Sequence, residues 1–124
     1  MPGPEEFEQG LSSLGLRTER RGDLVVVHVE PPKGPAAGTS VEVGADPPPD
    51  YPRIPPHWLH LPVRFELPGG GRNGSELGAG WSRWSRPHPR WRAGSGAANQ
   101  WVAHVRALLA EATVAGCSLG TPRR

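Results

Sequence analysis

Apolar side chains in this chain fall into short runs separated by glycine- and proline-rich stretches. The clearest run, residues 24–29, is rich in valine and has the length of a strand, so it predicts a β-strand. Gly22 before it is a turn signal, and residues 15–20 are therefore expected to pair with this strand as a hairpin. Residues 39–43 alternate between polar and apolar side chains and predict another short strand.

A further apolar run, residues 58–65, alternates only in part. Pro62 cannot donate to a sheet ladder, so this run predicts an edge strand or an interrupted one. Six prolines in residues 47–56 restrict that stretch to polyproline II and turns. We favour a connecting loop there over a ligand for a proline-recognising domain. Residues 68–80 predict a glycine-rich loop.

Both ends of the chain favour helix. Pro4 and the glutamates that follow it suit a first helical turn, although Gly10 interrupts the pattern. Apolar residues at spacings of three and four predict an amphipathic helix over about 99–112. Asn99 or Ser95 is expected to cap its start.

These elements predict an α+β fold. We expect an antiparallel four-stranded meander, with the N-terminal and C-terminal helices packed on one side of it. A length of 124 residues indicates one domain. We expect residues 5–115 to form this domain, with flexible ends at residues 1–4 and 116–124.

Composition narrows the classes of protein that fit. The single cysteine, Cys117, excludes an internal disulfide and a CxxC metal site. No apolar run approaches the length of a membrane span, and no basic segment followed by an apolar one marks a signal peptide. We therefore expect a cytoplasmic protein. The net charge of +2 is small for a general nucleic-acid binder.

The most distinctive segment is residues 81–91. It holds three tryptophans, three arginines and a histidine in eleven residues, with no acid among them. Two prolines in its interior argue against a strand and predict an ordered, non-repetitive segment. Rings of this size need a surface to cover, so the segment is either a docking surface or a plug over the core.

The tryptophans and arginines of this region allow several interpretations. We expect Trp91 and Trp101 in the core, while Trp81 and Trp84 are balanced between core and surface. The arginines could bind single-stranded nucleic acid together with the rings, or grip carboxylates of a protein partner. We favour a solvated arginine face with cation–π packing. The arginines concerned are Arg83, Arg86, Arg90 and Arg92.

Candidate chemistry in the segment centres on His88, which lies between two prolines. It could be a general base, a nucleophile or a hydrogen-bond donor, and we favour a structural histidine. Ser82 or Ser85 could accept an acyl group as an oxyester, with His88 as the base nearest in sequence.

A metal site is not favoured by the sequence. His57 and His60 are three residues apart, which places them on opposite faces of a strand, and no acid is well placed to orient them with His88. We expect neither a metal nor another cofactor.

Two motifs resemble a known family. Tyr51-Pro-x-x-Pro-Pro56, directly before a strand, resembles the loop before the last strand of the ubiquitin-conjugating-enzyme (UBC) fold. Trp84-Ser-Arg86, His88 and Trp91, followed by a helix, resemble the bacterial group called prokaryotic family E. This resemblance covers residues 5–112. It implies a pathway with a ubiquitin-like protein, an activating enzyme and a JAB-type metalloprotease.

The chain departs from that family at the decisive position. The catalytic cysteine of the family would fall near Arg83 to Ser85, where there is none, and Cys117 lies beyond the last helix. We therefore expect a component that carries no thioester and binds the ubiquitin-like protein or its activating enzyme. A non-cysteine enzyme and an Arg/Trp nucleic-acid module are the alternatives. The candidate catalytic residues are His88 and Ser85, and the candidate binding residues are Trp84, Arg86, Arg83, Trp81 and Tyr51.

Overall fold

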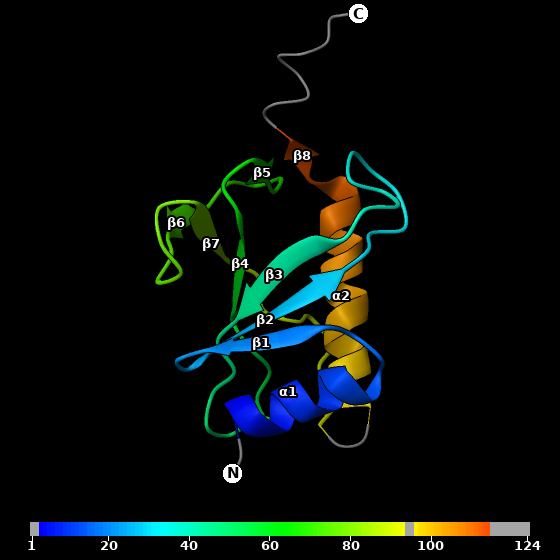
Figure 1. Ribbon diagram of the computed structural model, residues 1–124, viewed down its shortest axis with the longest axis vertical. Coiled ribbons are helices and arrows are strands. Elements are labelled where there is room, and N and C mark those ends of the chain that lie inside the picture. Colours follow the sequence, from blue (N-terminus) through cyan, green and yellow to red (C-terminus); the bar gives the residue numbers. More distant parts are fainter. Residues whose placement is uncertain (1–2, 94–95, 115–124) are drawn as a thin grey trace, which may run out of the picture.

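The structure is a computed structural model that describes residues 3–93 and 96–114. Its elements are α1 (Pro4–Ser13), β1 (Thr18–Arg21), β2 (Leu24–Val29), β3 (Val41–Ala45), β4 (Trp58–Pro62), β5 (Phe65–Glu66), β6 (Arg72–Gly74), β7 (Trp81–Ser85), α2 (Ala97–Glu111) and β8 (Thr113–Val114). Six strands form an antiparallel sheet in the order β1-β2-β3-β4-β7-β6, and β5 pairs with β8 (Figure 1). The predicted α+β class is confirmed.

The predicted meander is present, but the sheet does not end with it. Strands β1 to β4 follow one another in space as they do in sequence, and the hairpin through Gly22 pairs Arg21 with Leu24. Strands β7 and β6 then extend the sheet beyond β4. The expected four-stranded sheet was therefore too small.

Strand β4 lies in the interior of the sheet, between β3 and β7. The expectation of an edge strand was wrong, whereas that of an interrupted strand is confirmed, because β4 ends at Pro62. The expectation that residues 81–91 are non-repetitive throughout was also wrong, because residues 81–85 form β7. Both prolines of that segment follow the strand, at positions 87 and 89, where no ladder needs their missing N–H groups.

The two helices pack against each other and against one face of the sheet (Figure 1). Phe7 of α1 meets Trp101 of α2 edge to face, with ring centroids 4.9 Å apart. A Cβ on Gly10 would stand 2.9 Å from Cβ of Ala98, so this glycine allows the close approach of the helices. Gly10, which the sequence suggested would interrupt α1, is needed for the packing of α1 against α2.

Helix α2 begins without the expected side-chain cap. Gly96 occupies the N-cap position with φ of 90°, and no side chain caps the helix. Asn99 lies inside the helix, so the capping role predicted for it was wrong, while Ser95 lies outside the described residues. Trp101 is 2 % exposed, and Trp91 packs against the core partly buried, as predicted. The expected tail and Cys117 lie outside the described residues.

The outer face of the sheet is partly covered by the loop between β6 and β7. A cross-strand row of Val26, Gly44, His60 and Arg83 runs over four strands. A Cβ on Gly44 would stand 2.8 Å from Leu77, so the glycine lets this loop close over the sheet. His60 is completely buried beneath it.

None of the helices within the described residues is long and apolar enough to cross a membrane.

The buried His60 makes a prediction about acid stability. Its Nδ1 lies 2.8 Å from Oγ of Ser75, and burial lowers its pKa from 6.5 to about 4. Because the folded pKa is the lower one, the unfolded chain binds more protons between these values, and stability falls as pH drops below 6.5. Between about pH 7.5 and pH 5 we expect this histidine to remove about 2 kcal/mol from the free energy of unfolding.

Urea denaturation of the wild type and of His60→Asn at both pH values measures this loss. The asparagine keeps a polar group near Ser75 but does not titrate in this range. We expect the variant to lose about 2 kcal/mol less than the wild type on acidification. An equal loss in both proteins would show that His60 is not the acid-sensitive group.

Candidate functional site

The proline-rich loop and the tryptophan segment meet at the end of the molecule where α2 begins. Nε1 of Trp91 donates a hydrogen bond to the carbonyl oxygen of Pro52, at 2.8 Å. The ring centroids of Trp91 and Tyr51 lie 6.2 Å apart, and Tyr51 meets Phe7 edge to face at 5.1 Å. Gln100 of α2 bonds the backbone N–H and carbonyl of Arg92. Trp91 and Pro52 are 39 positions apart in the sequence, and their contact joins the two motifs into one site.

Tyr51 supports this site from within. It is 3 % exposed, and burial, reinforced by the charge of Glu6, raises the pKa of its hydroxyl to about 12. The hydroxyl is therefore protonated at every physiological pH. The ring that was predicted to bind a partner is a core residue, and it holds the loop against α1 and Trp91.

A serine and a histidine lie in hydrogen-bond contact where β4 begins and β7 ends. Oγ of Ser85 is 2.6 Å from Nε2 of His57. The β4–β7 ladder brings them together, because Ser85 is opposite Trp58 and the N–H of Arg86 donates to the carbonyl of His57. Among the described residues, no carboxylate is hydrogen bonded to His57. The arrangement is a serine–histidine pair without an acid.

This pair was not foreseen. The sequence indicated His88 as the base for Ser85 because it was the nearest histidine, but the histidine in contact comes from the other strand. A prediction that residues 81–85 form a strand beside residues 58–62 would have pointed to His57. Ser82 is 4 % exposed and accepts a hydrogen bond from Arg72, so of the two candidate serines it is Ser85 that reaches the site surface.

His88 bonds to the backbone of its own segment. Its Nδ1 accepts a hydrogen bond from the N–H of Arg90 at 3.0 Å. Its ring lies 5.5 Å from that of Trp91 and 4.9 Å from that of His104. Burial lowers the pKa of His88, and the neighbouring His104 lowers it further. This environment favours the neutral imidazole, with the remaining proton on Nε2.

His104 fixes the segment from the side of α2. Its Nε2 donates to the carbonyl of Arg86 at 3.0 Å, which assigns the proton to that nitrogen because a carbonyl can only accept. The two histidines therefore link the turn after β7 to the helix and to Trp91.

Arg86 clamps the glycine-rich loop to the end of β7. Its guanidinium donates to the carbonyl oxygens of Ser85, Pro68 and Gly70, each at 2.8 Å. It also lies over the ring of Trp84, 5.7 Å from the centroid. The side chain that was predicted to bind a partner is occupied by three carbonyls of its own chain.

Trp84 faces the core from β7 and is completely buried. Arg72 lies over the ring at 5.1 Å, and Nε1 has no hydrogen-bond partner among the described residues. The ring has no exposed surface to offer a base or a partner side chain. Its burial removes the central ring from the nucleic-acid stacking platform that the sequence left as an alternative.

The outward-facing side of β7 carries Trp81 and Arg83. The guanidinium of Arg83 lies 4.2 Å above the ring of Trp58 and pairs with Glu76 at 3.2 Å. Trp81 is half-buried, and the guanidinium of Arg21 from the β1–β2 hairpin lies 5.9 Å from the centroid of its ring. These residues form the cation–π packing that the sequence favoured.

The described residues contain no group of three or more His, Cys, Asp or Glu side chains that could hold a metal ion. His57 bonds Ser85, His60 bonds Ser75, and His88 bonds its own segment, so the three histidines face different surroundings. None of the described residues is a cysteine, because Cys117 lies outside them.

No family model, no curated protein and no solved structure matches this chain.

The clamp formed by Arg86 can be tested through stability. Arg86→Ala removes the donor of the carbonyls of Pro68 and Gly70, and water can replace it because the 68–70 loop is exposed, so we expect a loss of about 1 kcal/mol in the free energy of unfolding. Hydrogen exchange of the amides at Gly69, Gly70 and Gly71 should also become faster. Arg90→Ala is the control, because the exposed Arg90 side chain bonds no described residue and should change stability by less than about 0.5 kcal/mol. Equal effects of the two changes would contradict the clamp.

Proposed function

We propose that this chain is a UBC-like component of a bacterial ubiquitin-like modification pathway, and that it carries no thioester itself. It binds the ubiquitin-like protein or its activating enzyme, and a JAB-type metalloprotease acts in the same pathway. The observation that carries the proposal is the contact between the two motifs that resemble the family. Trp91 of the second motif bonds Pro52 of the first, and its ring packs on Tyr51.

The order of elements also supports the proposal. A helix, a four-strand meander, a proline-rich loop before the fourth strand and a closing helix follow one another as in the ubiquitin-conjugating fold. The departure is β7, which lies beside β4 where the family has its irregular active-site segment. Incorporation of this segment into the sheet, together with the missing thiol, suits a binding role better than thioester chemistry.

The exposed residues of the site indicate how a partner would be gripped. Ile54, inside the Tyr51–Pro56 motif, is 41 % exposed and offers an apolar contact. Arg90 and Arg92 are exposed, and their guanidinium groups bond no described residue. An exposed apolar side chain on the loop, together with free arginines on both sides of Trp91, suits a protein surface with carboxylates around an apolar patch.

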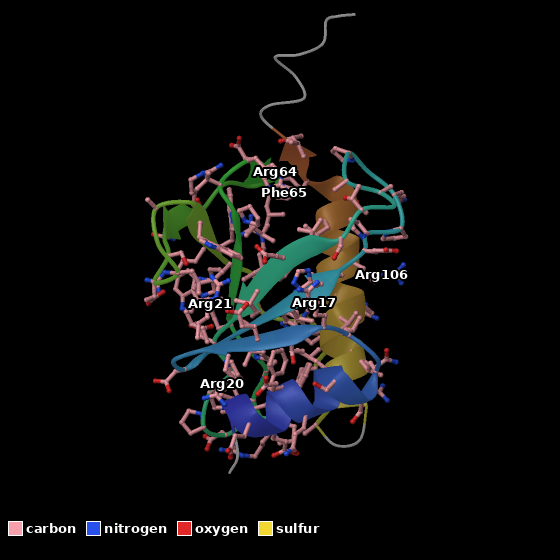
Figure 2. All side chains as sticks on the ribbon, in the orientation of Figure 1. Arg17, Arg20, Arg21, Arg64, Phe65 and Arg106 are labelled. Carbon is pink, nitrogen blue, oxygen red and sulfur yellow. The ribbon has the colours of Figure 1, made fainter. Side chains whose placement is uncertain are left out.

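The test is reconstitution with the ubiquitin-like protein and the activating enzyme of the same genome. We expect biolayer interferometry to detect binding to one of them, weakened at least about tenfold by the double change Arg90→Glu/Arg92→Glu. Arg64→Glu is the matched control, because Arg64 is also exposed but lies beyond the opposite end of β4 (Figure 2). With ATP present, we expect no adduct that a reductant removes. An adduct that is lost in Cys117→Ser would overturn the proposal, as would the absence of binding to both proteins.

A second candidate function is acyl transfer to Ser85, which the 2.6 Å contact with His57 favours. In this reaction Oγ of Ser85 would attack the carbonyl carbon of an activated acyl group while Nε2 of His57 takes the hydroxyl proton. The leaving group would depart with that proton, and the product would be an ester on Ser85. Such an ester resists reductants, which separates it from a thioester.

p-Nitrophenyl acetate is a suitable probe for this second function. We expect slow release of nitrophenolate and one acetyl group on Ser85, found by peptide mass mapping. Because the base is His57, His57→Gln should lower the acetylation rate at least about tenfold, while His88→Gln should leave it nearly unchanged. Equal rates in the wild type and Ser85→Ala would exclude a nucleophilic serine.

A further inference from the structure

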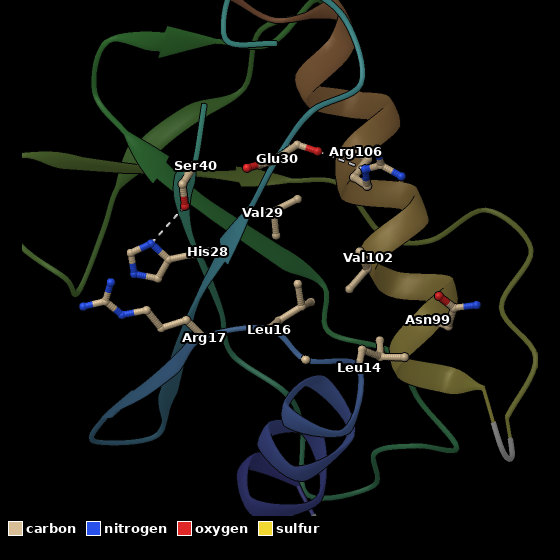
Figure 3. A pocket seen from close by; sticks show the side chains of 11 residues that line it. Leu14, Leu16, Arg17, His28, Val29, Glu30, Ser40, Asn99, Val102 and Arg106 are labelled. Carbon is tan, nitrogen blue, oxygen red and sulfur yellow. Dashed lines mark hydrogen bonds between the residues drawn. The ribbon is translucent and has the colours of Figure 1, made fainter. Parts of the chain in front are cut away.

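Helix α2 presents three faces to different parts of the molecule. One face, which includes Trp101, is buried in the core. Another, which includes Val102 and Arg106, lines a hollow of about 450 Å³ beside the end of α1 (Figure 3). The third carries Gln100 and His104, which bond the chain that follows β7. Neither of these two residues lines the hollow, so the third face is separate from it.

His88 holds the chain after β7 through a bond that only its neutral ring can make. Its Nδ1 accepts a hydrogen bond from the backbone N–H of Arg90 at 3.0 Å. A proton on Nδ1 would turn this acceptor into a donor that faces another donor. The turn at residues 88–90 therefore loses its hydrogen bond when His88 becomes charged.

This turn sets the position of Trp91. The ring centroids of His88 and Trp91 lie 5.5 Å apart, and Nε1 of Trp91 donates to the carbonyl oxygen of Pro52. Loss of the bond between His88 and Arg90 therefore acts on the residue that joins this segment to the proline-rich loop.

The groups around His88 on its own segment and on α2 disfavour a proton. The ring centroid of His104 lies 4.9 Å from that of His88, and Glu111, the one carboxylate of α2, is about two turns farther along the helix. The charged side chains of residues 86–92 are all arginines. Burial, and then the charge of His104, lower the pKa of His88, and a hydrogen bond to the backbone of Gln100 offsets them only in part.

The proline-rich loop, which Trp91 contacts, supplies no compensating charge. Asp50 is the one acid among residues 47–56, and its carboxylate pairs with Arg53 at 2.8 Å. Burial keeps the hydroxyl of Tyr51 protonated, with a pKa of about 12. No free carboxylate of this loop is therefore available to a protonated His88.

We propose that His88 and His104 form a pH-sensitive latch that releases residues 86–91 from α2 and from the proline-rich loop in mild acid. Because the pKa of docked His88 is below its ordinary value of 6.5, the released segment binds more protons, and release increases as pH falls below 6.5. Strand β7 ends at Ser85, before this segment, so the opening is local. The latch does not depend on the proposed function, but its consequence, weaker partner binding in acid, rests on it.

Hydrogen exchange of the Trp91 indole, followed by NMR on the protein alone, measures the latch, because this proton bonds Pro52 only in the docked form. We expect its protection factor to fall at least about threefold between pH 7.5 and pH 5.5, within the roughly tenfold per pH unit that one proton allows. The backbone amide of Val105, on the buried face of α2, is the internal control and should keep its protection. An unchanged indole, or a loss of the same size at Val105, would overturn the proposal.

Variants at the two histidines assign the effect. His88→Asn keeps an acceptor, because an asparagine side chain can bond the N–H two residues on, but it does not titrate and should stay docked at both pH values. His104→Gln keeps a donor for the carbonyl of Arg86 without the neighbouring charge, so its loss should be smaller than in the wild type. His57→Gln is the matched control and should respond as the wild type does, because His57 bonds Ser85 outside the latch. A response of wild-type size in His88→Asn or in His104→Gln would contradict the latch.

Partner binding gives an independent reading. In the interferometry assay, binding by the wild type should weaken over the same pH range, and binding by His88→Asn should not. If no partner binds at any pH, the proposed function fails, while the indole measurement still decides the latch.

Discussion

The pairing of β4 with β7 is the interaction on which the rest of the site depends. Five residues of each strand are in register, from Trp58 opposite Ser85 to Pro62 opposite Trp81. Alternation along β7 then sends Ser82 and Trp84 to the core and leaves Trp81, Arg83 and Ser85 on the other face. A shift by one residue would exchange the two sets and place the Trp84 ring in solvent. The hydrogen-bond ladder between β4 and β7 therefore decides which side chains of residues 81–85 are buried.

This ladder also determines what the arginines can do. Arg86 follows the last paired residue and turns back onto the glycine-rich loop, and Arg83 stacks on Trp58. Arg72, on the neighbouring strand, bonds Ser82 and covers Trp84. These three arginines next to the tryptophan rings already contact other groups of the same chain. An extended platform for nucleic-acid bases would need both free arginines and exposed rings, and here most of them are used for packing.

Two surfaces retain unused binding capacity. One surrounds the contact between the proline-rich loop and Trp91, where Ile54 of the loop and Arg90 and Arg92 next to Trp91 are exposed. The other is the hollow lined by residues around the end of α1 and by α2, with Leu14, Val102 and Arg106 in its wall. The Ser85–His57 pair adds a nucleophile to the first surface only.

Local features of the sequence determined the secondary structure of the simple elements. The valine run of β2, the turn at Gly22 and the spacing of Trp101, Val105 and Leu109 in α2 each depend on neighbours within a few residues, and their structures agree with prediction. The burial of Trp101 and the packing of Trp91 against the core followed from the size of their rings.

The tertiary structure decided everything that depends on long-range pairing. Nothing local to residues 81–85 shows that β4 is their partner, so the strand, the burial of Trp84 and the contact between Ser85 and His57 could not be read from the segment alone. The same holds for Gly10, whose role lies in its distance to Ala98 on the other helix. Sequence patterns report which side chains prefer burial, but the contacts between distant strands and helices decide which of them obtain it.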